Sequence, residues 1–106
     1  TDFPIEKVNP IATFFSAVYR QNAAFKPDEG FQMENALSKE EAIRSMTIWP
    51  AKATFEERVK GSIEKGKFAD FVLLDRDLMT VIKKEVLSTK VIMTIIGGEV
   101  VYSLLP

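Results

Sequence analysis

The chain has 106 residues, of which 46% are apolar and 27% are charged, a composition typical of one small globular domain. Its net charge is −1, with acidic and basic residues interspersed, so it lacks the clustered positive charge of nucleic-acid-binding proteins and anionic-membrane binders. The absence of cysteine and histidine excludes disulfides, thiolate metal sites and the commonest base at neutral pH.

The beginning of the sequence, "TDFPIEKVNP", contains neither an initiator methionine nor the apolar core of a signal peptide. We therefore expect it to come from the middle of a longer chain. No apolar run approaches the length of about 18 residues that a transmembrane helix needs. On these grounds we expect a cytoplasmic protein without membrane contacts.

The first predicted helix covers residues 10–21. Asn9 can accept a hydrogen bond at the N-cap, and Pro10 suits the first helical position, where no N–H donor is needed. Apolar residues then recur at the spacing of one helix face, which we interpret as facing the core: Ile11, Phe14, Phe15 and Val18. Residues 22–37 follow and contain turn-forming residues at 27, 28 and 30, so we predict a loop, which at this length is either functional or mobile.

A second helix begins at a capping box. Ser38 and Glu41 have the S-x-x-E spacing in which each side chain binds the backbone N–H of the other. We expect this helix to continue to about residue 48 and to break at Pro50, because proline lacks a donor and clashes with the preceding turn. A short helix is then predicted over residues 51–57.

The last third of the chain has the pattern of strands. Residues 70–75 form an apolar run rich in β-forming residues, and residues 90–103 contain two such runs around Gly97–Gly98. A Gly-Gly pair predicts a hairpin, because a type I′ turn needs a positive φ at both positions. Between them, residues 78–88 predict a loop with a helical turn. Helices first and strands last indicate an α+β fold, whose few strands need a partner at their edges.

One stretch has the glycine spacing of a phosphate-binding loop. Gly61, Gly66 and Lys67 match G-x-x-x-x-G-K, but Phe68 stands where Ser or Thr should bind Mg²⁺. A phosphate-binding loop also follows a strand and precedes a helix, whereas here the predicted order is reversed. We therefore interpret these residues as a turn that leads into a strand.

Three further features need an interpretation, and two of them have both a functional and a structural one. Asp70 could be a catalytic acid, but we favour an acceptor that stabilises a turn. Trp49 with Arg44 and Arg20 could stack on a nucleotide, but we favour a core or interface aromatic residue. Lys83-Lys84 most simply forms a solvated face.

Four segments, in the correct order, resemble the amidohydrolase superfamily. The segment "KGSIEKGKFADFVLLDRD" is similar to G-S-[IL]-x-x-G-K-x-A-D-[FLV]-[VL]-[VL]-L-D, and "VIMTIIGGEVVY" to the segment that closes those chains. The stretch "LSKEEAIRSMTIWPAKATFEE" resembles the pair of helices that precedes them. The opening "TDFPIEKVNPIATFFSAVYRQ" resembles the SD-x-P-[VI]-x-x-x-(N/D)-P segment of the amidohydrolase-3 branch.

This resemblance implies a fold for the whole protein. Such enzymes are metal-dependent hydrolases with a (β/α)₈ barrel and a small β-sandwich assembled from both ends of the chain. By the resemblance, this chain is the C-terminal portion. Residues 1–58 would supply helices of the outer layer of the barrel, and residues 59–106 would supply part of the composite sandwich as a small antiparallel sheet.

The resemblance also assigns one site residue. Asp2 matches the aspartate that ends the last barrel strand, binds the metal and transfers a proton to and from the attacking water. The parent enzyme would hold a divalent metal, zinc by the resemblance, and hydrolyse a carbon–nitrogen bond other than a peptide bond in a small molecule. The family's His-x-His, its carbamylated Lys or Glu and its two later histidines are absent here. Because a catalytic zinc needs about three protein ligands, we expect the isolated chain to bind no metal and to be inactive.

A second hypothesis needs no catalysis. An exposed apolar edge favours pairing with another chain, so these residues could act as an association module. The module would pair with a second copy through the hairpin edge or through residues 22–37. We therefore expect the isolated chain to form a homo-oligomer.

Overall fold

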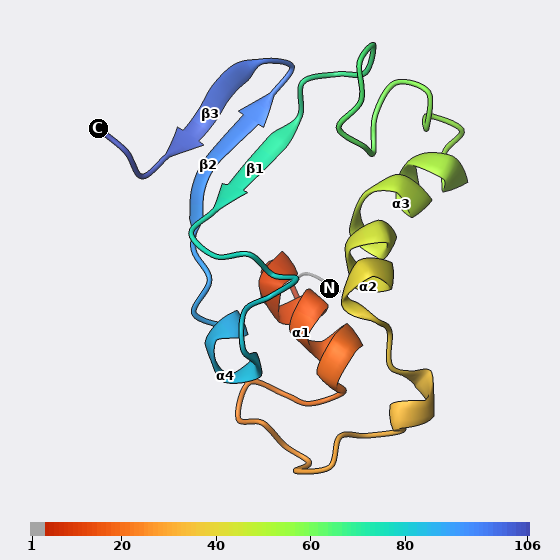
Figure 1. The fold of residues 1–106 in the computed structure, drawn as a ribbon, viewed down its shortest axis with the longest axis vertical. Helices are drawn as coiled ribbons and strands as arrows, with labels where there is room; N and C mark the ends of the chain where they lie inside the picture. The colour runs from red at the N-terminus through yellow and green to blue at the C-terminus, as the bar shows by residue number, and fades with distance from the viewer. Residues whose placement is uncertain (1–3) are drawn as a thin grey trace. The chain divides into compact units, whose positions relative to one another are not determined.

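The computed structural model describes residues 4–106 and has an α+β fold, with helices first and an antiparallel sheet of three strands last (Figure 1). The elements in chain order are α1 (Pro10–Tyr19), the 3₁₀ turn η1 (Met33–Asn35), α2 (Lys39–Met46), α3 (Ile48–Ala53), β1 (Phe71–Leu74), α4 (Lys83–Val86), β2 (Val91–Ile96) and β3 (Glu99–Ser103). This order confirms the predicted one. No helix in the described range is long and apolar enough to cross a membrane.

The chain divides into two compact units. The first unit holds the described residues up to Ile43 together with Leu78–Ser88, and therefore contains α1, η1 and α4. The second unit holds Arg44–Asp77 and Thr89–Pro106, and therefore contains α3 and the sheet.

The first unit has a closed core built on α1. The Asn9 Oδ1 accepts a hydrogen bond of 3.0 Å from the Ile11 N–H, and Pro10 occupies the first helical turn, as predicted. The side chains of Ile11, Phe14 and Phe15 are buried on the predicted face. The ring of Phe15 also contacts Phe25 edge-on, with 5.5 Å between the ring centroids. The other buried apolar residues of this unit are Ala42, Leu78 and Val86.

The capping box of α2 is formed as predicted. The Glu41 side chain accepts a hydrogen bond of 2.9 Å from the Ser38 N–H, and the Ser38 hydroxyl accepts one of 3.1 Å from the Glu41 N–H. The bonds from the Ser38 backbone and side chain stabilise the ionised carboxylate and lower the pKa of Glu41.

The break between α2 and α3 does not lie where the sequence predicted it. The helix was expected to run to about residue 48 and to break at Pro50, but α2 ends at Met46 and α3 already begins at Ile48. Thr47 interrupts the two helices with φ −130° and ψ −87°. Pro50 then lies in the first turn of α3, where backbone N–H groups have no intrahelical acceptor, so proline costs nothing there. The short helix predicted over residues 51–57 corresponds to α3, which ends at Ala53.

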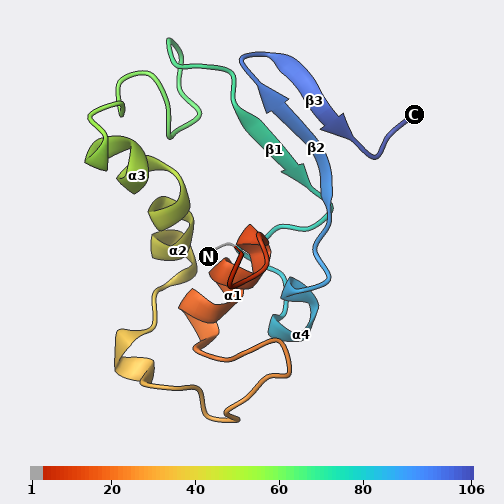
Figure 2. The same cartoon turned by 180° about the vertical axis from the view of Figure 1, so that it is seen from behind.

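The sheet has the strand order β1-β2-β3, with both pairs antiparallel, and Figure 2 shows the three strands from behind. The predicted hairpin is present: Gly97 and Gly98 connect β2 to β3 with φ of 58° and 85°. The register pairs Thr94 with Val72 of β1 and with Tyr102 of β3. Each pair of strands has a register shift, which lies between Leu73 and Leu74 in β1 and between Thr94 and Ile95 in β2.

Both faces of this sheet carry apolar side chains. Paired residues share a face, so Phe71, Ile95 and Val100 lie on one face, and Val72 and Tyr102 lie on the other. Val72, Val100 and Tyr102 are 58%, 56% and 46% exposed. An antiparallel sheet with one solvated face normally alternates apolar with polar residues, and this sheet does not.

Candidate functional site

The metal-binding residue expected from the resemblance, Asp2, lies outside the described residues. The described residues themselves offer no substitute. Within residues 4–106, no group of three or more His, Cys, Asp or Glu side chains could hold a metal ion. This part of the chain therefore does not fit a catalytic metal, which needs about three protein ligands in one place.

The glycine-rich stretch forms a turn, and its lysine is held within that turn. The Lys67 ammonium donates a hydrogen bond of 2.6 Å to the Ser62 hydroxyl and makes an ion pair of 2.9 Å with Glu64. The Ser62 hydroxyl also donates to Glu64, and the bonds from Ser62 and Lys67 lower the pKa of that carboxyl. Because α3 ends before this turn and β1 begins after it, the order is the reverse of a phosphate-binding loop.

Gly61 in this turn has a role in packing. Its φ is 95°, and a Cβ built on it would lie 2.7 Å from the Cβ of Ala51 in α3. Gly66 has a similar φ of 94°, but a Cβ there would meet nothing within 4 Å. Of these two positions, only Gly61 therefore has a close contact that a larger residue would disturb.

Asp70 accepts hydrogen bonds at the hairpin. Its Oδ1 accepts a bond of 2.8 Å from the Gly97 N–H, and the neighbouring Ala69 carbonyl accepts one of 2.9 Å from the Gly98 N–H. These bonds connect the residues before β1 to the turn between β2 and β3. The favoured interpretation, an acceptor that stabilises a turn, is confirmed.

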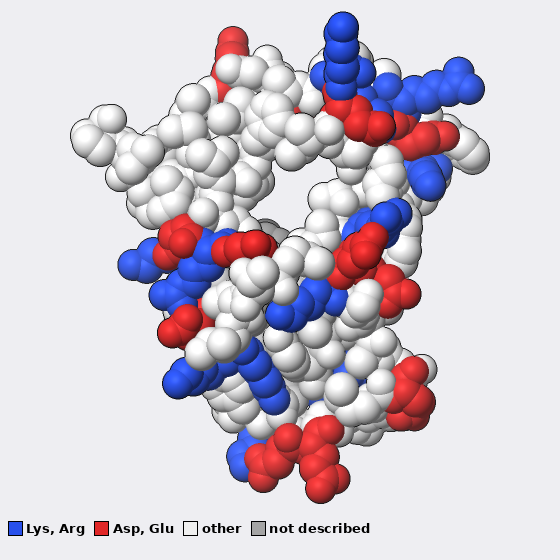
Figure 3. Space-filling view, viewed as in Figure 1, with Lys and Arg blue, Asp and Glu red and all other residues white. Residues whose placement is uncertain are grey.

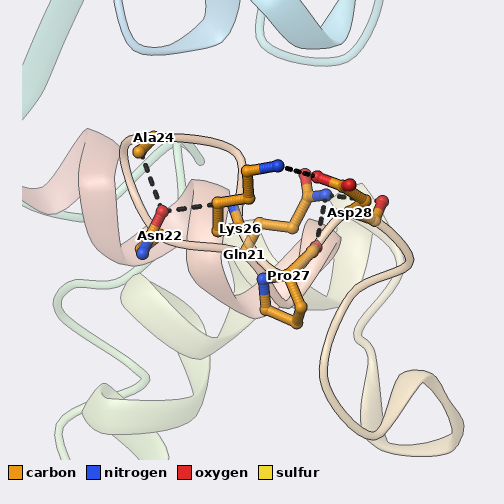
Figure 4. A network of polar contacts seen from close by, with 6 residues as sticks. All are labelled: Gln21, Asn22, Ala24, Lys26, Pro27 and Asp28. Carbon is orange, nitrogen blue, oxygen red and sulfur yellow. Dashed lines mark hydrogen bonds and ion pairs between the residues drawn. The ribbon is translucent and has the colours of Figure 1, made fainter.

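Residues 20–31 are held in place by a buried glutamine (Figure 4). Gln21 is 5% exposed, and its Nε2 donates hydrogen bonds of 2.9 Å to the carbonyls of Pro27 and Asp28. The Asn22 Oδ1 accepts from the N–H groups of Ala24 and Lys26 at 2.9 and 3.1 Å, which closes the turn before Pro27. The Gln21 Oε1 is buried and accepts no hydrogen bond from the described residues.

A shallow cavity of about 310 Å³ lies beside this network. Ser16, Arg20 and Phe31 line it together with Gln21 and its neighbours. Both cationic side chains at this cavity already have partners within the chain. The Arg20 Nε donates a hydrogen bond of 2.9 Å to the Phe31 carbonyl, and the Lys26 Nζ makes an ion pair of 2.5 Å with Asp28. The sequence analysis missed Gln21; its only signal is an amide residue directly after the apolar face of a helix.

The aromatic and basic residues proposed as a nucleotide-stacking set belong to different units. Arg20 belongs to the first unit, where its guanidinium lies 6.0 Å from the centre of the Phe31 ring, while Trp49 and Arg44 belong to the second unit. Trp49 is 41% exposed and so is not a core residue of the described chain. Lys83 is exposed, as expected, but its ammonium also lies 5.5 Å from the centre of the Tyr19 ring.

The surface drawn in Figure 3 has two kinds of area. Acidic and basic side chains lie next to one another over most of it, whereas the area over β3 and the C-terminal residues is almost entirely uncharged. This matches the exposure of β3, all of whose residues are exposed. Large exposed apolar patches are typical of interaction surfaces.

Comparison with known proteins identifies the family. A model of the amidohydrolase family matches residues 1–102, which is nearly the whole chain. The chain belongs to the amidohydrolase family. An N-substituted formamide deformylase of Arthrobacter pascens is 32% identical over 102 residues, covering 96% of this chain and 18% of the relative. A putative amidohydrolase, YtcJ, of Bacillus subtilis is 29% identical over 96% of this chain and 19% of its own length.

The fold agrees with that of a solved amidohydrolase. The crystal structure of an amidohydrolase from Thermotoga maritima MSB8 matches with a TM-score of 0.56 and 28% identity, over 67% of this chain and 17% of that chain. The amidohydrolase resemblance drawn from the four sequence segments is therefore confirmed. This amidohydrolase chain spans less than a fifth of the length of the curated relatives that it matches.

Proposed function

We propose that these residues are the C-terminal part of a metal-dependent amidohydrolase that cleaves a carbon–nitrogen bond other than a peptide bond in a small amide or cyclic amide. The observation that carries the proposal is the family match over residues 1–102. The 32% identity to a protein named as an N-substituted formamide deformylase supports an amide substrate.

In this proposal the chain contributes structure and one site residue. Residues 1–58 are helices of the outer layer of a (β/α)₈ barrel, and residues 59–106 are part of a composite β-sandwich. Asp2 is the residue at the site, as a metal ligand and a proton acceptor. The other ligands of a divalent metal, which we take to be zinc, would come from elsewhere in the parent polypeptide, because the described residues do not fit a metal. The two exposed apolar faces of the sheet support a sandwich completed by other strands.

The activity is tested on the polypeptide that contains these residues together with the barrel. We expect it to hydrolyse an N-substituted formamide or a cyclic amide, and to lose the activity when a chelator removes the metal. Asp2→Asn should lower kcat by at least about a hundredfold without changing the fold, because the amide cannot accept a proton. The 106-residue chain alone should be inactive. Activity that survives both the chelator and Asp2→Asn would contradict the proposal.

A second candidate is the non-catalytic association module. It is supported by β3, which is exposed along its whole length and carries neither proline nor lysine to block pairing at its free edge. A homo-oligomer of the isolated chain that is disrupted by Val101→Lys on β3 would support it. The two candidates are compatible, because the first concerns the parent enzyme and the second the isolated chain.

A further inference from the structure

Residues 78–88, which we call the strap, connect two paired strands of the second unit but belong to the first unit. The chain leaves the second unit after Asp77 and returns to it at Thr89. Two neighbouring antiparallel strands need only a short connection, of about two to five residues in most hairpins. The strap is longer than that, so joining β1 to β2 does not by itself explain it.

The sheet ends at a closed neck where the strap begins and ends. The Asp75 N–H donates a hydrogen bond of 3.0 Å to the Lys90 carbonyl, and the Lys90 N–H donates one of 2.8 Å to the Asp75 Oδ1. These bonds follow directly on the last strand pair, which joins Leu74 to Val91. The strap itself therefore takes no part in the strand pairing.

Two buried side chains anchor the strap in the first unit. Leu78 at its start is 7% exposed, and Val86 near its end is 0% exposed. The helix in the strap, α4, has only four residues, and a helix of this length is not stable in water by itself. The structure of the strap therefore depends on the burial of its apolar side chains in the first unit.

Two lysines add polar contacts to this anchor. The Lys39 ammonium, on α2, donates hydrogen bonds of 3.1 and 3.5 Å to the carbonyls of Met79 and Val81. The Lys83 ammonium, on α4, lies 5.5 Å from the centre of the Tyr19 ring on α1, next to which Figure 2 shows α4. One cation thus reaches the strap from the helices of the first unit, and another reaches those helices from the strap.

We propose that the strap is a conformational device that controls one end of the sheet: its packing in the first unit keeps the neck closed, and its release opens the neck. Both ends of the strap lead directly into the neck, so its two positions are coupled through the chain. A short segment with few buried side chains is typical of the units that open locally in native proteins. The proposal uses only contacts within this chain and does not depend on the proposed enzymatic activity.

Two variants loosen the strap in different ways. Lys39→Met removes the two hydrogen bonds and leaves the sequence of the strap unchanged. Val86→Ala shortens a fully buried side chain, and because alanine favours helix more than valine does, a loss of α4 cannot come from helix propensity. Lys84→Met is the matched control, because it makes the same substitution as the first variant at an exposed lysine of α4.

The test is backbone amide exchange of the purified chain, compared at three amides. The Glu85 N–H, which donates 2.9 Å to the Ile82 carbonyl, reports on the strap. The Asp75 N–H reports on the neck. The Gly97 N–H, which is bound to Asp70 just before β1, reports on the opposite end of the same strand.

We expect release of the strap to be visible at the neck. Lys39→Met should speed exchange of the Glu85 and Asp75 amides by the same factor, about fivefold, the effect of losing one or two hydrogen bonds. Val86→Ala should speed both by about tenfold or more, because it partly empties a fully buried site. The Gly97 amide should keep its rate in both variants, and Lys84→Met should exchange like the wild type.

Three results would overturn the proposal. The first is faster exchange at Glu85 with an unchanged rate at Asp75, because the strap and the neck would then open independently. The second is equal acceleration at Asp75 and Gly97, which would show a general loss of stability of the sheet. The third is an unchanged rate at both Glu85 and Asp75. Should Val86→Ala fail to fold, Lys39→Met decides among these outcomes alone.

Discussion

The two units differ in how many of their apolar residues are fully buried. In the described part of the chain, every buried apolar residue except Ala51 lies in the first unit. Phe14 and Phe15 on α1 are 0% and 1% exposed, whereas every residue of β3 is exposed. The helical unit therefore has a buried core of its own, while the sheet leaves apolar side chains exposed.

The largest expected effect is the loss of stability when a buried side chain of the first unit is removed, compared with an exposed one of the second. Phe14→Ala should lower the free energy of unfolding by about 4 kcal/mol, because it empties a fully buried site. Val100→Ala on β3 should change it by less than about 0.5 kcal/mol, because this side chain is 56% exposed. Urea denaturation of the isolated chain measures both. Equal losses at the two positions would mean that the sheet already has a core.

The next effect concerns two glycines of the second unit. Gly61→Ala should cost about 3 kcal/mol, because the new Cβ adds a clash with Ala51 to the strain of a positive φ. Gly66→Ala is the matched control and should cost about 1 kcal/mol, because its φ is almost the same but the space is open. The difference in unfolding free energy isolates the contact between the turn and α3. A larger loss at Gly66 would show that the turn does not pack against the helix as described.

A smaller effect is expected at the hairpin. Asp70→Ala should cost about 1 kcal/mol, because it removes the acceptor of the Gly97 N–H. The amide exchange of Gly97 should become faster, while that of the residues in α1 stays unchanged. Asp70→Asn keeps an acceptor oxygen and should retain most of the protection. Unchanged exchange at Gly97 in Asp70→Ala would show that this hydrogen bond is not maintained in solution.

The smallest effect is the pH dependence of the α2 capping box. The folded pKa of Glu41 lies below its ordinary value of 4.5, so the ionised carboxylate stabilises the fold fully above that pH. This contribution is lost as the pH falls from about 4.5 through the lowered folded pKa. Glu41→Gln should therefore be less stable than the wild type at pH 7, and the difference should shrink in acid. A stability difference that stays constant down to pH 2 would exclude the carboxylate as its cause.

The local rules of the sequence predicted what depends on a few neighbouring residues. Asn9 and Pro10 begin α1, Ser38 and Glu41 begin α2, and Gly97–Gly98 forms the hairpin turn. In each case the side chain or the φ preference acts within four positions of itself, so the sequence order alone was sufficient.

The sequence analysis placed one helix break wrongly and missed two local features. The break at Thr47 was placed at Pro50, because the sequence does not show which turn of a helix a proline will occupy. The phenylalanine at position 55 gave no sign of a left-handed residue, since glycine is the expected signal. Gln21 binds carbonyls six and seven residues further on, beyond any capping pattern.

The candidate catalytic site was predictable only through the family resemblance. The sequence contains no histidine or cysteine, so no pattern of such ligands points to a metal site at Asp2. The role of Asp2 therefore stays a prediction, while membership of the amidohydrolase family is confirmed by the match over residues 1–102.

The most direct test of the contrast between the two units is backbone amide exchange of the isolated chain, measured residue by residue. If the first unit closes its own core and the sheet lacks its second layer, the amides of α1 should exchange at least about tenfold more slowly than those between β2 and β3. Amides of β2 and β3 that are as slow as those of α1 would contradict this account. They would show that the second unit is stable without a partner.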